Sequence, residues 1–268
     1  MASVETMTEL AAPVREAVRD LILVLADSKR LLGMRYGEWI LGAPELEAGI
    51  ACAAMAQDEW GHARLLYALL KDFDEDVRAL EHGREPHQYA SMEALDREPE
   101  SWFDLVALNA LADTALSVQC EALQGSSYAP LAARVGKLLE EERIHAAHGA
   151  AWFRRLAGAS DEARTALADA AAAIFPGLLR WFGPEDGRTA LLAGAGVIDR
   201  GADQLRARFL ERIAPLLDAL GERGDALRAT VPSFEGFDAA RRRGSPAGPD
   251  AATVARIRGD KNRAFLVD

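Results

Sequence analysis

The sequence contains two copies of the pattern Glu-x-x-His, Glu59-Trp60-Gly61-His62 and Glu142-Arg143-Ile144-His145. Three residues along an α-helix turn the chain by about 300°, so the carboxylate and the imidazole of each copy project from nearly the same face. Two such pairs on facing helices, with carboxylates from two further helices, form the di-iron or di-manganese site of a four-helix bundle. The alternative is that both copies are surface Glu/His pairs without a metal, although two of only five histidines complete the motif.

The two motifs predict a role for each of their side chains. Glu59 and Glu142 would be the catalytic, metal-bridging carboxylates, and His62 and His145 would each bind one metal. Iron and manganese both accept this ligand set, so the sequence does not separate them.

An acidic residue precedes each motif glutamate, Asp58 in the first copy and Glu141 in the second. Each lies one helical turn before its histidine, where it could accept a hydrogen bond from the second ring nitrogen of a metal-bound imidazole. The alternative for both residues is a solvated charge on a helix surface.

A further ligand is expected from the third long helical segment, where Asp113 stands between apolar residues. A lone aspartate in the middle of a helix is unfavourable unless it has a partner. The other acid of this segment, Glu121, lies eight residues further on and near the helix end, so Asp113 is preferred.

The first helical segment departs from the pattern, because Lys29 and Arg30 stand at the depth where a carboxylate ligand is expected. A cation there would either bind an anion, such as a charged substrate, or leave the metal site incomplete. Asp27, about one turn earlier, could reach in as a substitute ligand.

Helical periodicity places all these residues on four long segments. They span residues 13–36, 45–71, 102–123 and 131–156, with a long loop or broken helix in the middle of the chain, and shorter helices are predicted near residues 162–175 and 201–220. The sequence therefore predicts an all-α, ferritin-like four-helix bundle with additional C-terminal helices. We expect one domain over residues 1–231 and an extended tail over residues 232–268, whose Arg241, Arg242 and Arg243 would be solvated.

Composition excludes several classes of protein. The net charge of −11 argues against nucleic-acid binding, which depends on clustered basic residues. The sequence has neither a membrane-spanning apolar segment nor a usual signal peptide. Cys52 and Cys120 fall on apolar helix faces and are expected to be buried free thiols, which suits a cytoplasmic protein.

Several segments resemble the phenylacetic acid catabolic proteins, the family of the catalytic and structural subunits of bacterial 1,2-phenylacetyl-CoA epoxidase. The segments are RYGEWILGAP (35–44), AQDEWGH (56–62), SYAP (127–130), EERIH (141–145), WFGP (181–184) and RARFL (206–210), and the likeness spans roughly residues 20–220. It implies that Glu59, His62, Asp113, Glu142 and His145 occupy dimetal-ligand positions of the catalytic subunit. The first-helix glutamate of that subunit falls on Lys29 or Arg30 here.

The leading interpretation is an O2-dependent monooxygenase subunit that acts on an aromatic or related acyl-CoA. It implies two iron ions, or manganese in their place, at incomplete occupancy, an electron-donating reductase and, as partner, a homo-oligomer or a related ferritin-like subunit. The alternatives are a ferritin-like metal-binding protein with another oxidative role and a non-catalytic structural subunit. Any shared dimetal site requires the side chains of His62 and His145 to lie within about 8 Å of each other.

Overall fold

The computed structural model describes residues 10–185 and 187–265. Within these residues every regular element is helical, as the sequence predicts, apart from one isolated bridge between Asp238 and Arg243. No helix in this part of the chain is long and apolar enough to cross a membrane.

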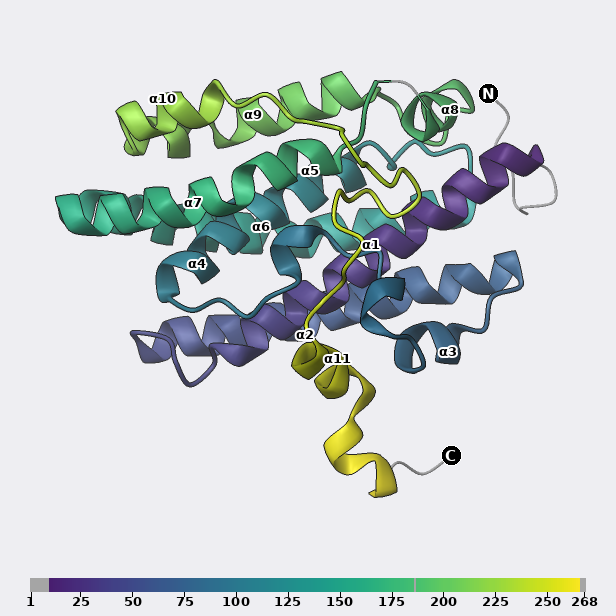
Figure 1. Cartoon of the computed structure of the whole chain (residues 1–268), viewed down its shortest axis with the longest axis horizontal. Coiled ribbons are helices and arrows are strands. Elements are labelled where there is room, and N and C mark those ends of the chain that lie inside the picture. Colours follow the sequence, from purple (N-terminus) through teal and green to yellow (C-terminus); the bar gives the residue numbers. More distant parts are fainter. Residues whose placement is uncertain (1–9, 186, 266–268) are drawn as a thin grey trace.

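Four long helical segments form the centre of the molecule, close to the predicted ranges. They are α1 (Ala12–Glu38), α2 (Leu46–Leu69), the continuous run α4 (Trp102–Ala107), η5 (Leu108–Asp113) and α5 (Thr114–Glu121), and α6 (Ala129–Ala159). Helix α1 packs along α2, and both α2 and α5 pack against α6 (Figure 1). Proline occupies the first turn of α1 and of α6, where the missing N–H would have no helical partner.

Short helices make the long connection in the middle of the chain. They are η2 (Leu70–Phe73), α3 (Val77–His82), η3 (Pro86–Gln88) and η4 (Glu93–Leu95). This segment leads from the end of α2 to the start of α4 and lies beside α1, so it covers one side of the central helices (Figure 1).

Of the next four helices in the chain, three form a layer over α4, α5 and α6, and α8 (Arg188–Gly194) packs against α1 (Figure 1). The three are α7 (Asp161–Trp181), α9 (Ala202–Ala219) and α10 (Glu222–Arg228). Helix α7 continues past the predicted end at residue 175, through Pro176. Both Pro176 and Ala172, whose carbonyl loses its helical partner, are exposed, so water can satisfy that carbonyl.

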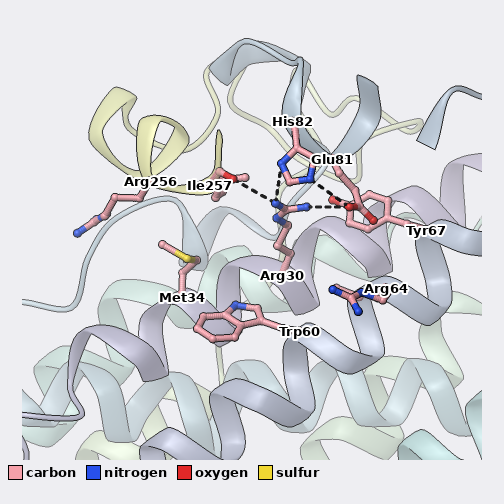
Figure 2. A pocket seen from close by; sticks show the side chains of 10 residues that line it. Arg30, Met34, Trp60, Arg64, Tyr67, Glu81, His82, Arg256 and Ile257 are labelled. Atoms are coloured by element: carbon pink, nitrogen blue, oxygen red, sulfur yellow. Dashed lines mark hydrogen bonds and ion pairs between the residues drawn. The ribbon is translucent and has the colours of Figure 1, made fainter. Parts of the chain in front are cut away.

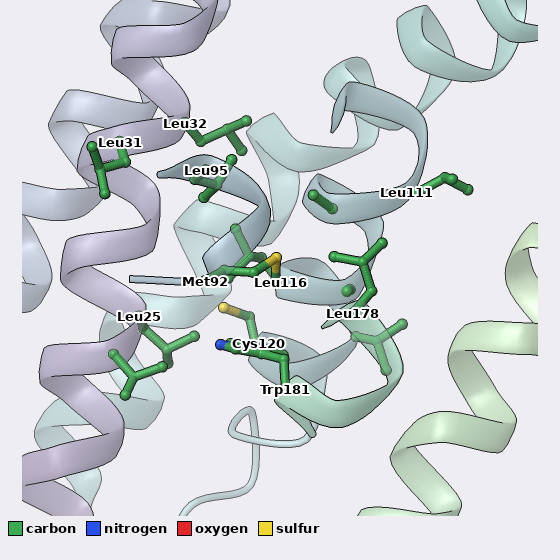
Figure 3. Close-up of a cluster of buried hydrophobic side chains, with 14 of the residues drawn as sticks. Leu25, Leu31, Leu32, Met92, Leu95, Leu111, Leu116, Cys120, Leu178 and Trp181 are labelled. Atoms are coloured by element: carbon green, nitrogen blue, oxygen red, sulfur yellow. The ribbon is translucent and has the colours of Figure 1, made fainter. Parts of the chain in front are cut away.

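One continuous hydrophobic core joins the two layers. Leu25 and Leu32 of α1, Leu116 of α5 and Trp181 of α7 meet in it (Figure 3). Cys52 and Cys120 are buried free thiols, as predicted, and burial raises the pKa of Cys120 to about 12. The side chains of the central helices are therefore held on both sides by close packing.

The segment after α10 is more ordered than the extended tail that the sequence predicts. Arg243 is fully buried and pairs with Asp96, and Arg242 is buried and donates to Gln119. The chain then forms α11 (Ala251–Arg258) and η6 (Asp260–Phe265). The interpretation of these arginines as solvated is wrong, because each finds an acceptor on a segment far away in the sequence.

The third long segment contains a π-helical stretch, η5, which ends at Asp113. Such stretches are rare and often mark functional sites, because they shift the following side chains around the helix. Asn109 of η5 packs against Gly149 of α6 and donates to the hydroxyl of Tyr36 and to the carbonyl of His145. The absence of a side chain at position 149 therefore lets η5 approach α6 beside the second motif.

Two glycines of α6 provide a matched test of this close approach. A Cβ at Gly149 would lie 2.8 Å from Asn109 Oδ1, whereas a Cβ at Gly136 would meet nothing within 4 Å. We expect Gly149→Ala to lower the free energy of unfolding by about 1–3 kcal/mol through overpacking. Gly136→Ala should raise it by about 0.5–1 kcal/mol, because alanine is the better helix former. Urea unfolding of both variants measures the difference, and equal effects would contradict the packing described.

Candidate metal centre

The five ligand-type residues predicted from the sequence meet between α1, α2, α6 and the junction of η5 with α5. One ligand atom from each of Glu59, Asp113, Glu142 and His145 lies within 4.8 Å of the others. All four side chains are buried, as is that of His62. The ring centroids of His62 and His145 are 6.3 Å apart, which confirms the predicted distance between them.

The middle of this group is occupied by the ammonium of Lys29, whose side chain is completely buried. Its Nζ lies 3.0 Å from Glu59 Oε1, 3.0 Å from Asp113 Oδ1 and 2.6 Å from Glu142 Oε1. An ammonium has three N–H donors, and each of them has a different carboxylate as its acceptor. We call the six residues Lys29, Glu59, His62, Asp113, Glu142 and His145 the Lys29 cluster.

Both histidines turn the same ring atom toward the carboxylates. The Nδ1 atom of His62 lies 3.2 Å from Glu142 Oε1, and that of His145 lies 3.2 Å from Glu59 Oε1. Neither contact has the alignment of a hydrogen bond, and Glu59 Oε2 also lacks a partner among the described residues. These three buried atoms face the interior of the cluster with bonding capacity unused.

The other ring nitrogens contact the two acids that precede the motifs, but across the helices. His62 Nε2 lies 2.7 Å from Glu141 Oε2, and His145 Nε2 lies 3.2 Å from Asp58 Oδ2. From the sequence, each acid was expected to serve the histidine of its own helix. In the structure each serves the histidine of the other motif, so the acids also tie α2 to α6.

Three polar residues that were not predicted from the sequence support the cluster. Tyr36 donates to Asp113 Oδ2 at 2.9 Å, and Ser117 donates to Glu142 Oε2 at 3.0 Å. Asn109 in turn donates to the hydroxyl of Tyr36 at 2.8 Å. Helical spacing could have pointed to two of them, because Ser117 lies one turn after Asp113 and Tyr36 lies two turns after Lys29.

Asp27 does not join the cluster. Its carboxylate pairs with Arg84, accepts from the hydroxyl of Tyr67, and accepts from the backbone N–H of Ala90 at 2.7 Å. Two residues along a helix correspond to about 200°, so Asp27 and Lys29 point to opposite sides of α1. Its proposed role as a substitute ligand is therefore not supported by its position.

Burial and charge act together on the titration of the cluster. Burial alone would lower the pKa of Lys29, but Asp113, Glu142 and Glu59 hold that pKa well above its ordinary value. Burial acts against ionisation of Asp113 and Glu59, yet Lys29 keeps the pKa of both carboxyl groups below the usual range. The ammonium and these two carboxylates are therefore charged at neutral pH.

The pKa values of the third carboxyl group, Glu142, and of both imidazoles are raised. Burial and the neighbouring Asp113 raise the pKa of Glu142 to about 8, although Glu142 is the carboxyl group nearest to Lys29 Nζ. Burial would lower the pKa of the histidines, but contact with carboxylates raises that of His62 to about 9 and that of His145 to about 11. One ammonium cannot neutralise three buried carboxylates, so protons gather on Glu142 and the imidazoles.

The residues present do not fit two metal ions. Glu59, Asp113 and Glu142 are the carboxylates that would hold two ions, but all three now accept hydrogen bonds from Lys29. The lysine also removes the carboxylate ligand that the first helix would supply and adds a positive charge in its place. Even a single ion held by the four converging ligand atoms would require the ammonium to leave.

Glu142 is also reached from the surface. A cleft of about 440 Å³ lies between α5, α6 and α9 and is lined by Ser117, Glu121, Glu142 and Arg212, among others. Arg212 makes two hydrogen bonds to Glu121 on its wall. Glu142 is therefore the residue of the Lys29 cluster that also forms part of the wall of this surface cleft.

Comparison with known proteins gives a consistent result. Residues 1–228 match the family described as phenylacetic acid catabolic protein. The chain is 31% identical over 192 residues to one of the 1,2-phenylacetyl-CoA epoxidase subunits of Escherichia coli (strain K12), a match that covers 69% of this chain and 61% of that protein. It is 32% identical over 143 residues to a different subunit of the same epoxidase, where the match covers 52% of this chain and 57% of that protein. The chain thus spans about three fifths of the length of each relative.

Proposed function

Because this chain belongs to the phenylacetic acid catabolic protein family, we propose that it is part of a multicomponent, epoxidase-type oxygenase that acts on an acyl-CoA thioester. Within that complex we assign it the structural position rather than the oxygen-activating one. The observation that carries this assignment is the ammonium of Lys29 among three carboxylates.

The assignment follows from what a lysine can and cannot do at this position. Oxygen activation in the related helical-bundle enzymes depends on two metal ions bridged by carboxylates, which bind O2 and change oxidation state. An ammonium carries a positive charge and three N–H donors, but it accepts no electrons and binds no O2. Lys29 therefore neutralises carboxylates on α2, on α6 and at the end of η5. It joins these elements to α1 without providing redox chemistry.

In this proposal the bundle is of the ferritin-like type, and the ion pairs of the Lys29 cluster hold its helices together. Glu59 and Glu142 link α2 and α6 to the ammonium on α1, and Asp113 adds the end of η5. A rigid bundle of this kind suits docking with a related subunit that carries the metals. The electron-donating reductase would then serve that partner.

One observation favours a second candidate, an oxygen-activating subunit. Glu59 Oε2 and the Nδ1 atoms of His62 and His145 face the cluster without hydrogen-bond partners among the described residues. Atoms of this type are good ligands for iron or manganese, which would use them if Lys29 withdrew. The position of Lys29 argues against this candidate. Withdrawal of its ammonium would leave three buried carboxyl groups close together without a counter-ion.

Oxygen consumption distinguishes the two candidates. Purified protein supplied with Fe(II), a chemical reductant and phenylacetyl-CoA should consume O2 no faster than a protein-free mixture, with the assembled E. coli epoxidase as the positive control. Substrate-dependent O2 uptake by this chain alone would contradict the structural assignment. The measurement reads chemistry directly and does not depend on recovering bound metal.

A further inference from the structure

A second pocket lies on the outer side of α1 and α2, behind the Lys29 cluster. Arg30 follows Lys29 and Trp60 follows Glu59, and one residue along a helix turns the side chain by about 100°. The inward-facing residues thus have outward-facing neighbours. We call the hollow of about 290 Å³ lined by Arg30, Trp60, Arg64, Glu81, His82 and Arg256 the Trp60 pocket (Figure 2).

The indole of Trp60 forms a flat platform in this pocket. Its side chain is 38% exposed. A Cβ at Gly33 would lie 2.7 Å from the indole Cδ1 and Nε1, so glycine is what allows the ring to lie against α1. One part of the ring is thus held by the helix and the rest stays open to the pocket. Such a surface suits stacking by a planar ring.

The charge of the pocket is positive and only partly neutralised. Arg64 is exposed and has no ion pair or hydrogen bond among the described residues. Arg30 donates to the carbonyl of Ile257, and its nearest acid, Glu81, is 3.8 Å away (Figure 2). In a chain with a net charge of −11, two guanidinium groups beside an open indole form a local surface that suits an anionic ligand with a planar ring.

Helix α11 adds the third wall. Arg256 pairs with Glu38 and Glu98 away from the pocket, which fixes the helix against the body of the molecule. Ile257 presents its carbonyl to Arg30, so the guanidinium plane is oriented before a ligand arrives. A guanidinium held in this way matches phosphate, which it binds through paired N–H donors.

We propose that the Trp60 pocket binds the phosphate-bearing nucleotide part of a ligand, with Arg64 and Arg30 on the phosphate and Trp60 under the base. The same chemistry belongs to coenzyme A and to free nucleotides such as ADP. This inference goes beyond the proposed function and does not need the chain to be catalytic. The proposed function brings an acyl-CoA to the complex, and this pocket would hold its nucleotide end.

Isothermal titration of the full chain with coenzyme A, ADP and inorganic phosphate tests the proposal. Both nucleotides should bind, and phosphate at the same concentrations should not. Arg64→Gln should weaken nucleotide binding by about tenfold or more, because it removes a charged hydrogen-bond donor. Trp60→Leu should weaken it by about tenfold, because it removes the stacking surface. Tighter binding of coenzyme A than of ADP would identify the coenzyme as the source.

Arg154→Gln is the matched control, because Arg154 is also exposed and without a partner among the described residues, but lies on α6 away from the pocket. It should leave nucleotide binding unchanged. Trp60→Phe keeps an aromatic ring and should retain part of the affinity for nucleotide. This variant shows whether Trp60→Leu weakens binding through lost stacking or through lost folding. The proposal is overturned if the unmodified chain binds neither nucleotide, or if it binds inorganic phosphate as tightly as it binds the nucleotides. It is also overturned if Arg64→Gln weakens nucleotide binding no more than Arg154→Gln does. Each result is independent of metal content and O2 consumption.

Discussion

Replacement of Lys29 with glutamate should convert this chain into a protein that binds about two divalent metal ions, as carboxylate-bridged bundle sites do. The substitution removes the ammonium from Glu59, Asp113 and Glu142 and supplies a carboxylate from α1. The Nδ1 atoms of both histidines already face the vacated space. Elemental analysis of Lys29→Glu after loading with Fe(II) or Mn(II) measures the gain.

The first of two controls separates the effect of adding a carboxylate ligand from the effect of removing the positive charge. Lys29→Gln removes the positive charge but adds no carboxylate, so it should bind fewer ions than Lys29→Glu. Asp27→Asn in the Lys29→Glu background should leave the metal content unchanged, because Asp27 is committed to Arg84, Tyr67 and Ala90. A folded Lys29→Glu protein that binds no metal would show that the remaining side chains are not a latent metal site.

Replacement of Lys29 with methionine should lower the free energy of unfolding by about 3–5 kcal/mol, the usual cost of removing one partner from a buried ion pair. Methionine has a similar length and no charge, so the cavity changes little while the charged carboxylates of Glu59 and Asp113 lose their shared counter-ion. Urea unfolding at neutral pH measures the loss. Lys137→Met, at an exposed position of α6, is the matched control and should be nearly neutral.

A double variant identifies the source of this loss. If repulsion between the charged carboxylates is the cause, adding Glu59→Gln to Lys29→Met should recover part of the lost stability, because the pKa of Glu59 lies below its usual range and its carboxyl group is charged. Additive losses in the double variant would instead indicate that packing of the lysine chain dominates. A Lys29→Met protein as stable as the unmodified chain would contradict the central role of the ammonium.

The helices and most of the cluster could be predicted from the sequence for simple physical reasons. Apolar periodicity defined α1, α2 and α6 to within a few residues. The Glu-x-x-His spacing fixed which side chains share a face, and the lone Asp113 in an apolar helix indicated a buried partner. That partner is Lys29.

The position of the lysine ammonium could not be predicted, because it depends on the rotation of α1. The sequence left Lys29 and Arg30 as alternatives, yet a rotation of about 100° sends one into the cluster and the other to the surface. The rotation of α1 also places Asp27 on the side of the helix opposite to the Lys29 cluster. The exchange of Asp58 and Glu141 between motifs depends on the distance between α2 and α6, and the burial of Arg243 depends on Asp96, which is far away in the sequence.

Metal content of the unmodified protein is the most direct test of the account. The full chain is purified from cells grown with added iron and manganese, reloaded anaerobically with Fe(II), passed through a desalting column and subjected to elemental analysis. With Lys29 as the resident cation, both metals should remain well below one ion per chain. Two ions per chain in the unmodified protein would contradict the account, because the one group of metal-ligand side chains among the described residues is the group that now surrounds the ammonium.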